Sequence, residues 1–411
     1  MISSATTIPA LAPAIRRLPD RVPRRLPARL RQLGRMMRGV LADMPEAIRR
    51  EYDYCTGTRR SAILTLTWRC TSHCQSCMVW RRPPQVQKEL SAQQWLDTAS
   101  KLVSRGMRSA ELFGGDVLLR KDVLLPLCEF LSASNCKVYI PTNCNLLDSP
   151  TAAVLARTVH TLFLSTDALA EAHDLIRGTP GTFSRVALAR QRLLEARAGG
   201  PRPRLICNTT VSRHNVDQLA DLAEFACRAG YDQIDLEYVG QFEDEHVGRS
   251  CIRGVTPSPM YLRQGESCLI TPDQVPLLRR QLELARSLRG RATASGRPFG
   301  VVTINIDMLS DQDLVAGTVP YRRCFMERAT TIIDPYGNIV PCLFFDNFSV
   351  GNVLDGSLDQ SWETPRRSQF RAHRQEGKLE LCRHCIMSVI RNRTGVDIVR
   401  RAMIEARQRR D

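Results

Sequence analysis

The strongest constraint on the fold is an alternation of short apolar runs, rich in β-branched residues, with amphipathic helical patterns from residue 62 onward. This alternation is typical of consecutive βα units, and so of an α/β fold with a parallel sheet. Six units are predicted, and a helical pattern follows each of the first five runs. Such a chain is expected to close into a partial or full βα barrel, in which the active site lies at the carboxyl ends of the strands. The predicted strands are 62–67, 109–113, 137–141, 160–165, 204–211 and 232–239.

The alternation breaks after residue 240, where glycines, prolines and charged residues indicate an insertion or linker. A helical pattern follows near 273–289. Past residue 320, two short strands are predicted around a turn within 331–340, which indicates a small second α+β domain. The expected divisions are a basic, Pro-rich arm at 1–60, a barrel at 61–240, a linker or insertion completing the barrel side at 241–315, the small domain at 316–395 and a basic helix or tail at 396–411.

The formal charge of +16 is unevenly distributed, because residues 1–40 hold nine arginines and one aspartate. From Leu26 to Leu41 apolar residues recur at helical spacing between arginines, which predicts a basic amphipathic helix. Three roles are open for it: an arm packed on the catalytic domain, a contact with a membrane surface, or an organellar transit peptide. No aromatic residue interleaves these arginines, so we expect no nucleic-acid partner.

The chain contains fifteen cysteines but no apolar run of eighteen residues and no signal-peptide pattern. A spanning helix and a secreted disulfide protein are therefore not expected. We expect a cytoplasmic protein, with peripheral membrane contact as one role open to the arm. In a reducing compartment, so many thiols point first to metal or iron-sulfur ligation.

Three cysteines, Cys70, Cys74 and Cys77, follow the first predicted strand with the spacing C-x3-C-x2-C. A 4Fe-4S cluster normally takes four cysteine ligands, so three leave one iron open to a non-protein ligand. A zinc site completed by His73 is the alternative, although zinc prefers paired C-x2-C knuckles.

This motif and its position strongly resemble the radical S-adenosylmethionine superfamily, over about residues 60–390. The resemblance implies a partial (β/α)6 TIM-like barrel of the radical SAM type, in which the open iron chelates S-adenosylmethionine. Reductive cleavage then yields a 5′-deoxyadenosyl radical that abstracts hydrogen from a substrate. The chain departs from the family at Ser76, where relatives usually carry an aromatic residue near adenine. Met78 or Trp80 is the expected replacement.

Motifs at the ends of later strands support the resemblance. Residues 113–116, Phe-Gly-Gly-Asp, are similar to the family's GGE motif, which holds the methionine amino group. Residues 141–144 are similar to a TNG turn, with Cys144 in place of glycine, and residues 165–167 resemble a segment near the ribose hydroxyls. The cofactor-binding residues that the resemblance implies are Gly114, Gly115, Asp116, Asn143, Ser165, Asp167 and Asn208.

Four further cysteines have the spacing C-x17-C, a gap of 39 residues, then C-x2-C: Cys324, Cys342, Cys382 and Cys385. Four thiolates can close one cluster, and a zinc ribbon is the alternative. The pattern resembles the SPASM and twitch subfamilies, and the twitch type, with one auxiliary 4Fe-4S cluster, fits the count better. That cluster is expected to pass electrons. Whether Cys251 or Cys268 adds a ligand is left open.

The reaction is the least constrained part of the prediction. Relatives with one auxiliary cluster include alcohol dehydrogenases of aminocyclitol antibiotic pathways and an enzyme of molybdopterin synthesis, so oxidation of a small molecule is the first hypothesis. Modification of a peptide is the alternative, because the 60 residues before the first strand look too short and too Arg/Pro-rich for a fused leader-binding domain. A non-catalytic iron-sulfur or zinc protein that binds nucleic acid is the third hypothesis. The expected electron donor is a flavodoxin or ferredoxin.

Candidate catalytic groups lie at or beyond the sixth predicted strand: Glu237, Tyr238 and Glu243. A carboxylate there could act as a general base. An equally simple interpretation is that these residues are solvated charges on loops with no catalytic role.

Overall fold

The structure is a computed structural model that describes residues 48–387, except 201, 295, 321–323, 357 and 359. The chain divides into two compact units, residues 1–56 with 393–411, and residues 57–392. In the first unit the described residues, 48–56, are helical. The helix predicted from Leu26 to Leu41 and the tail predicted at 396–411 lie outside the described residues. The second unit contains the sheet and both groups of motif cysteines.

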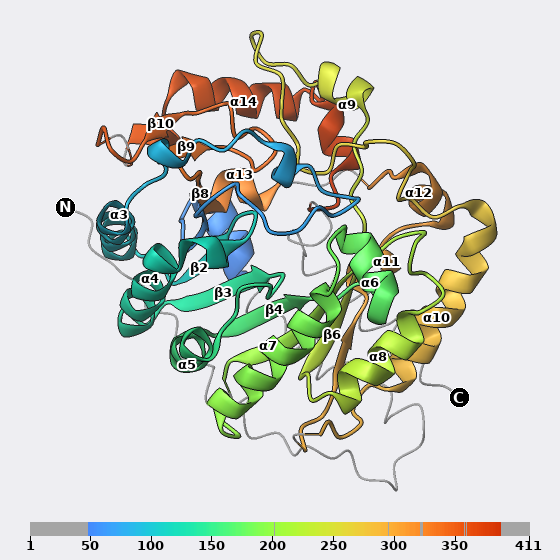
Figure 1. Cartoon of the computed structure of the whole chain (residues 1–411). Coiled ribbons are helices and arrows are strands. Elements are labelled where there is room, and N and C mark those ends of the chain that lie inside the picture. The colour runs from blue at the N-terminus through green and yellow to red at the C-terminus, as the bar shows by residue number, and fades with distance from the viewer. Residues whose placement is uncertain are drawn as a thin grey trace, which may run out of the picture. The chain divides into compact units, whose positions relative to one another are not determined.

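A single ten-stranded sheet runs through the second unit in the order β10-β9-β8-β1-β2-β3-β4-β5-β6-β7 (Figure 1). Neighbours from β8 to β7 are parallel, while β9 and β10 are antiparallel. Because β10 and β7 are edges, the barrel stays open, and the predicted α/β partial barrel with its small domain is confirmed. The strands are β1 Ser61–Thr65, β2 Ser109–Phe113, β3 Lys137–Thr142, β4 Thr161–Ser165, β5 Arg204–Val211, β6 Gln233–Tyr238, β7 Gly300–Val302, β8 Thr330–Ile333, β9 Asn338–Val340 and β10 Gly351–Asn352.

The carboxyl-terminal hairpin extends the barrel sheet. Strands β8 and β9 form the hairpin predicted within 331–340. Strand β8 pairs in parallel with β1, in a register that places Ser61 opposite Thr330 and Leu64 opposite Ile333. Parallel strands end at the same edge of a sheet. The first cysteine motif therefore follows β1, and the second cysteine motif follows β8 and its hairpin, from the same edge of the sheet.

Local capping fixes where several helices begin. Ser91 and Gln94 form a reciprocal capping box at the start of α3, and Asp148 accepts a hydrogen bond from the Thr151 backbone N–H at the start of α5. The helices are α3 Ala92–Ser104, α4 Lys121–Ala133, α5 Ser149–Thr158, α6 Ala170–Arg177, α7 Thr182–Arg197, α8 Leu219–Arg228, α9 Asp244–Gly248, α10 Val275–Ser287, α11 Ile304–Asp307, α12 Asp311–Ala316, α13 Phe325–Ala329 and α14 Pro365–Gln375.

Short 3-10 segments occupy several connections: η1 Val79–Arg81, η2 Val86–Lys88, η3 Val117–Arg120, η4 Pro272–Gln274, η5 Gln360–Trp362 and η6 Glu380–His384. The helix predicted near 273–289 is α10. Among the described helices, none combines the length and the hydropathy that crossing a bilayer requires.

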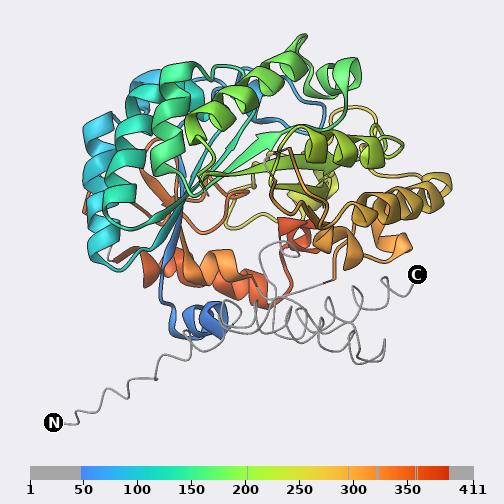
Figure 2. The same cartoon turned by 90° about the horizontal axis from the view of Figure 1, so that it is seen from below.

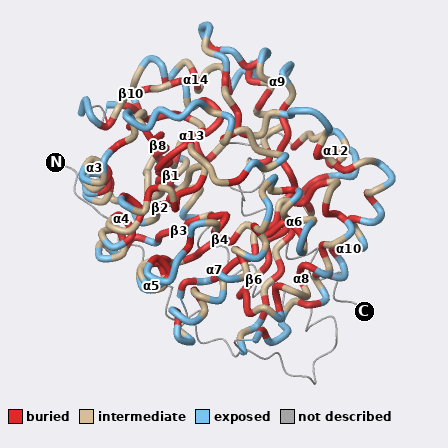
Figure 3. Tube along the Cα trace, viewed as in Figure 1, coloured by how far each residue is buried: buried red, intermediate tan, exposed pale blue. Residues whose placement is uncertain are grey.

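The two faces of the sheet differ in character. In β2, Ala110 and Leu112 are fully buried, whereas Glu111 and Phe113 on the other face are half-buried. The buried positions join one apolar core with the helices, and buried residues concentrate along the strands (Figure 3). Figure 2 shows the light-blue to green helices of the barrel on one side of the strands and the orange and red helices on the other. The half-buried face therefore lines the inside of the open barrel.

A stacked cation–indole–cation arrangement ties the start of β1 to the small domain. The Arg59 and Arg367 guanidinium carbons lie 3.4 and 3.6 Å from the Trp362 ring centroid. Arg367 is fully buried and donates a hydrogen bond to the Glu327 carbonyl at 3.1 Å. Cation–π contacts are strongest where water is excluded, so Trp362 acts as a central packing element between two distant segments.

Replacing Trp362 with alanine should lower the free energy of unfolding by about 3–5 kcal/mol, because a large buried side chain and two cation–π contacts are lost. Trp362→Phe, which keeps an aromatic face, should cost clearly less. Urea denaturation followed by circular dichroism measures both. Equal losses for the two variants would show that ring contacts with the guanidinium groups contribute nothing.

Candidate functional site

The first cysteine motif lies on a loop that leaves β1 and is pinned to the end of α6. Its three half-buried thiols are Cys70, Cys74 and Cys77. The backbone N–H groups of His73 and Gln75 donate to the carbonyls of Arg177 and Ile176 at 3.0 and 3.1 Å. Gly178 ends α6 with a φ of 60°, and a Cβ there would clash with the His73 carbonyl oxygen. Glycine is thus needed for conformation and for space.

The Gly114-Gly115 turn after β2 packs directly on the same loop. The Gly115 and Asp116 N–H groups donate to the Thr67 and Arg69 carbonyls at 2.9 and 2.8 Å. A Cβ on Gly114 would lie 2.5 Å from the Thr67 oxygen, and one on Gly115 would clash with the Arg69 oxygen. The sequence predicted that these glycines let the backbone approach a ligand. In the structure, the close approach is to the cysteine loop itself.

Asp116 and two asparagines hold the hydroxyl side chains of the loop. The fully buried Asp116 carboxylate accepts a hydrogen bond from the Thr71 hydroxyl at 2.5 Å, and burial raises its pKa. The Asn143 amide donates to the Thr71 and Ser72 hydroxyls at 3.0 and 3.2 Å. Asn145, which the sequence did not single out, donates to both at 3.0 and 3.1 Å. This network fixes the segment between Cys70 and His73.

A buried arginine connects the loop with the end of β4. The Arg177 guanidinium donates to the Cys74 sulfur at 3.8 Å and pairs with Asp167 at 2.6 Å. Burial works against the charged form of Arg177, but Asp167 and Cys74 outweigh it and raise its pKa. Asp167 also accepts from the Thr210 N–H at 2.9 Å, and its own N–H donates to His173 Nδ1 at 3.1 Å. Sequence analysis assigns no role to Arg177 or His173.

The thiols of the loop lie in a partly desolvated environment. Burial raises the pKa of Cys70 to about 11 and of Cys77 to about 12, and it also raises the pKa of Cys74. Bound as cluster ligands, they would be thiolates, because metal binding displaces the proton. The buried Arg177 is placed to offset part of that negative charge.

Other predicted residues meet on the half-buried face at the strand ends. Ser165 on β4 lies opposite Asn208 on β5, and Thr210 lies opposite Glu237 on β6. All four are half-buried. They form a polar surface inside the open barrel, next to the residues that hold the cysteine loop.

Two of the predicted catalytic groups serve local structure. The Tyr238 hydroxyl is buried, donates to the Leu314 carbonyl at 2.5 Å and accepts from the Ile270 N–H at 3.0 Å. Burial raises its pKa, and both of these contacts give Tyr238 a structural role, so its catalytic role stays a prediction. Glu243 caps α9 and accepts from the Gln241 amide at 2.8 Å. Of the predicted groups, Glu237 alone lies on the strand face that lines the barrel.

A polar cavity borders the first cysteine motif. Met78 and Trp80, the residues expected to replace the missing aromatic side chain at position 76, both line it. Trp80 lies 4.8 Å from the His73 ring and donates to the Cys74 carbonyl at 3.4 Å. Cys268 lines this cavity rather than the second cysteine site. The lining residues are His73, Cys74, Gln75, Cys77, Met78, Trp80, Arg81, His214, Gln264, Glu266 and Cys268.

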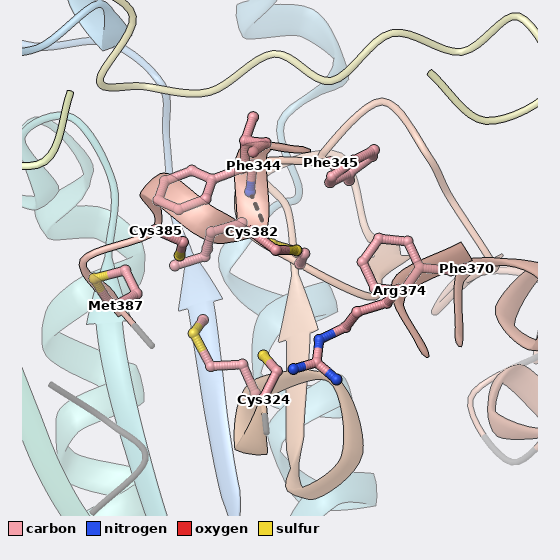
Figure 4. Close-up of a pocket in the computed structure, with 12 residues that line it drawn as sticks. Cys324, Phe344, Phe345, Phe370, Arg374, Cys382, Cys385 and Met387 are labelled. Atoms are coloured by element: carbon pink, nitrogen blue, oxygen red, sulfur yellow. Dashed lines mark hydrogen bonds between the residues drawn. The ribbon is translucent and has the colours of Figure 1, made fainter. Parts of the chain in front are cut away.

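The second cysteine motif converges on an apolar cavity in the small domain (Figure 4). Cys324 precedes α13, Cys342 follows β9, and Cys382 and Cys385 lie in and after η6. The hairpin that presents Cys342 turns at Gly337, which has a φ of 82°. Burial raises the pKa of Cys382 to about 12 and raises that of Cys342 well above its usual range.

Both donor sets consist of cysteine thiols, which ligate iron-sulfur clusters and can also ligate zinc. Within the described residues, no three His, Cys, Asp or Glu side chains are arranged to hold one metal ion. Three thiols on one loop and four around an apolar cavity fit the larger iron-sulfur clusters.

Comparisons with known proteins find one family match and several proteins that are similar over most of this chain. Residues 324–386 match the SPASM family, an iron-sulfur cluster-binding domain. The mycofactocin maturase MftC of Mycobacterium ulcerans is 28% identical over 78% of this chain and 79% of its own length. The PqqA peptide cyclase of Streptomyces rochei is 24% identical over 81% of this chain and 83% of its own. Streptococcus suis SuiB bound to S-adenosylmethionine shares the fold, with a TM-score of 0.58, 16% identity and coverage of 86% and 80%.

The chain belongs to the radical S-adenosylmethionine superfamily and carries a SPASM domain. It is therefore an enzyme that uses S-adenosylmethionine, a 4Fe-4S cluster and an auxiliary iron-sulfur cluster, as predicted. Two relatives that align over most of the chain are named a maturase and a peptide cyclase.

Replacing Gly115 with alanine should displace the cysteine loop, because the new Cβ clashes with the Arg69 carbonyl. We expect the anaerobically reconstituted enzyme to lose about four of its roughly eight irons, together with cleavage of S-adenosylmethionine. Gly248→Ala is the matched control, since a Cβ there meets no atom within 4 Å. Full iron content in Gly115→Ala would contradict the role given to this turn.

His173 should make stability depend on pH. Burial lowers its pKa to about 4 from 6.5, so the folded state holds it neutral. The folding stability that neutral His173 contributes is fully present above about pH 6.5. It is lost as the pH falls toward about 4, because the unfolded chain then binds a proton that the folded chain does not. His173→Asn keeps an acceptor but does not titrate. As the pH is lowered over this range, the urea midpoint of the cluster-free protein should therefore fall less steeply in His173→Asn than in wild type. Parallel curves of midpoint against pH would show that His173 does not make stability depend on pH.

Proposed function

We propose that this enzyme modifies a peptide by radical chemistry. The observation that carries the proposal is the alignment with the mycofactocin maturase and the PqqA peptide cyclase, which spans about four fifths of this chain and of each relative. The sporulation killing factor maturation protein SkfB of Bacillus subtilis is also 27% identical, over 41% of this chain. When bound, the cluster and S-adenosylmethionine supply a 5′-deoxyadenosyl radical that removes hydrogen from the substrate.

The residues of the first site have distinct parts in this proposal. Cys70, Cys74 and Cys77 hold the radical cluster, and the Gly114-Gly115 turn with Asp116 and Asn143 keeps their loop in place. Arg177 and Asp167 support it from the side of α6 and β4, through the ion pair at 2.6 Å. Ser165 and Asn208, side by side on β4 and β5, lie on the face where the cofactor would extend across the strand ends.

The substrate would enter the open barrel along its half-buried face. That face offers polar and aromatic side chains at successive strands, among them Phe113, Tyr139, Asn208 and Glu237. An extended peptide needs such a lining, since its backbone groups require hydrogen-bond partners when buried. Glu237 is the carboxylate on this face that we assign as the candidate base.

The small domain holds the auxiliary cluster through Cys324, Cys342, Cys382 and Cys385. A flavodoxin or ferredoxin is the proposed electron donor. A protein that binds a precursor's leader segment can be a separate chain, so the composition of residues 1–60 does not weigh against a peptide substrate.

The test uses synthetic peptides that correspond to short reading frames next to the gene. Incubated with the reconstituted enzyme, S-adenosylmethionine and dithionite, one of them should lose two hydrogens, as a thioether or carbon–carbon crosslink requires. Mass spectrometry locates the change, and 5′-deoxyadenosine is quantified in the same sample. The variant with Cys70, Cys74 and Cys77 replaced by alanine is the control. Unchanged peptides, together with oxidation of an added alcohol, would instead support the small-molecule reaction.

A further inference from the structure

Residues 256–264, which we call the bridge segment, connect the two cysteine motifs by hydrogen bonds. On the side of the first motif, the N–H of Met78, which directly follows the third cysteine, donates to the Met260 carbonyl at 2.7 Å. On the side of the second motif, the Ser258 N–H donates to the Phe344 carbonyl at 3.0 Å. These two positions of the bridge segment are only two residues apart.

Phe344 belongs to the second cysteine site. It lines the apolar cavity there (Figure 4), and its own N–H donates to the Cys342 sulfur at 3.4 Å. Its ring packs edge-on against Tyr261 of the bridge segment, with 5.6 Å between the ring centroids. Any displacement of the bridge segment therefore disturbs the backbone beside a cluster ligand.

Arg82 attaches the bridge segment to the base of the first cysteine loop. The Arg82 guanidinium carbon lies 4.3 Å from the ring centroid of Trp68, which precedes Cys70 by two residues. The same guanidinium donates to the Ser258 carbonyl at 2.7 Å. Together with the hydrogen bond from Met78, these contacts hold the first motif on both of its flanks.

Asp346, four residues after Cys342, supplies the charge opposite to Arg82. Arg82 forms an ion pair with Asp346, and the Ser258 hydroxyl donates to the same carboxylate. The two charged side chains are only 18% and 12% exposed. In such partly desolvated surroundings, a charge without its partner costs more than at the surface, so each of the two residues fixes the position of the other.

A cluster at the second site would order the segment that carries Asp346. Its four cysteine ligands come from separate parts of the chain, and metal binding stabilises the folded arrangement of such ligands. Because Asp346 is close in sequence to Cys342, fixing the cysteine also fixes the carboxylate. The order then extends through Arg82 to Trp68 and the first cysteine loop.

We propose that the Arg82–Asp346 ion pair, acting with the bridge segment, couples the two cluster sites, so that a filled second site strengthens binding of S-adenosylmethionine at the first. Both residues are positioning residues. They act on the first motif through Trp68 and on the second through Ser258 and Phe344. The coupling is reciprocal, because one free energy links both binding equilibria. The inference rests on the cysteine assignments and holds for either class of substrate.

The test measures the dissociation constant of S-adenosylmethionine by anaerobic calorimetry without a reductant, so that the cofactor binds but is not cleaved. Full-length enzyme with both clusters is compared with the four-alanine variant, in which Cys324, Cys342, Cys382 and Cys385 are replaced. An iron content of about four in this variant first checks the cysteine assignment. The four-alanine variant should bind S-adenosylmethionine about fivefold or more weakly than the enzyme with both clusters.

Asp346→Asn, which removes the charge but keeps the shape of the side chain, is introduced into both proteins. In the enzyme with both clusters it should weaken binding about fivefold or more, whereas in the four-alanine variant it should add no further loss. Glu129→Gln is the matched control, because it breaks an ion pair with Arg157 in which the side chains are 51% and 56% exposed. It should leave the dissociation constant unchanged.

An unchanged dissociation constant in the two-cluster Asp346→Asn enzyme would overturn the proposal. Equal losses in both backgrounds would also overturn it, because Asp346 would then act independently of the second cluster. If Asp346→Asn loses the second cluster, Arg82→Gln breaks the same ion pair from the barrel side and is compared with Arg82→Lys, which keeps the charge. Arg82→Lys should bind S-adenosylmethionine more tightly, and equal binding would overturn the proposal. No peptide enters the experiment, so its outcome does not depend on the proposed substrate.

Discussion

Parallel pairing of β8 with β1 is the contact on which the arrangement of this enzyme depends. Because both strands end at the same edge of the sheet, the loop of the first cysteine motif and the hairpin of the second leave from adjacent strands. Further contacts reinforce this edge. The Leu90 N–H donates to the Pro335 carbonyl at 2.8 Å, and Arg82 pairs with Asp346. The small domain is thereby an extension of the barrel sheet.

The cysteine loop is held from several sides, and each support uses a different kind of group. Backbone carbonyls of the loop accept from the turn after β2, hydroxyls accept from the asparagines after β3, and a thiol accepts from the arginine that ends α6. A loop without regular structure needs such external partners for its polar backbone. This explains why the polar motifs occur at successive strand ends, where parallel strands bring them together.

Local patterns predicted much of this molecule. All six barrel strands appear close to their expected positions, since β-branched runs and glycine-rich turns depend on neighbouring residues. The cysteine spacings likewise predicted both clusters. Three features depend on distant contacts and were not predictable: the pairing of β8 with β1, the ion pair between Arg177 and Asp167, and the burial of the Tyr238 hydroxyl against Leu314. A strand-end position such as that of Tyr238 does not show which way the side chain points.

The claim that two separate cysteine sets build two clusters is tested most directly by iron and sulfide quantitation after anaerobic reconstitution. Wild type should bind about eight irons and cleave S-adenosylmethionine. Replacing Cys70, Cys74 and Cys77 with alanine should leave about four irons and no cleavage, and replacing Cys324, Cys342, Cys382 and Cys385 should also leave about four. A loss of all iron from either variant, or stoichiometric zinc at the second site, would contradict the account.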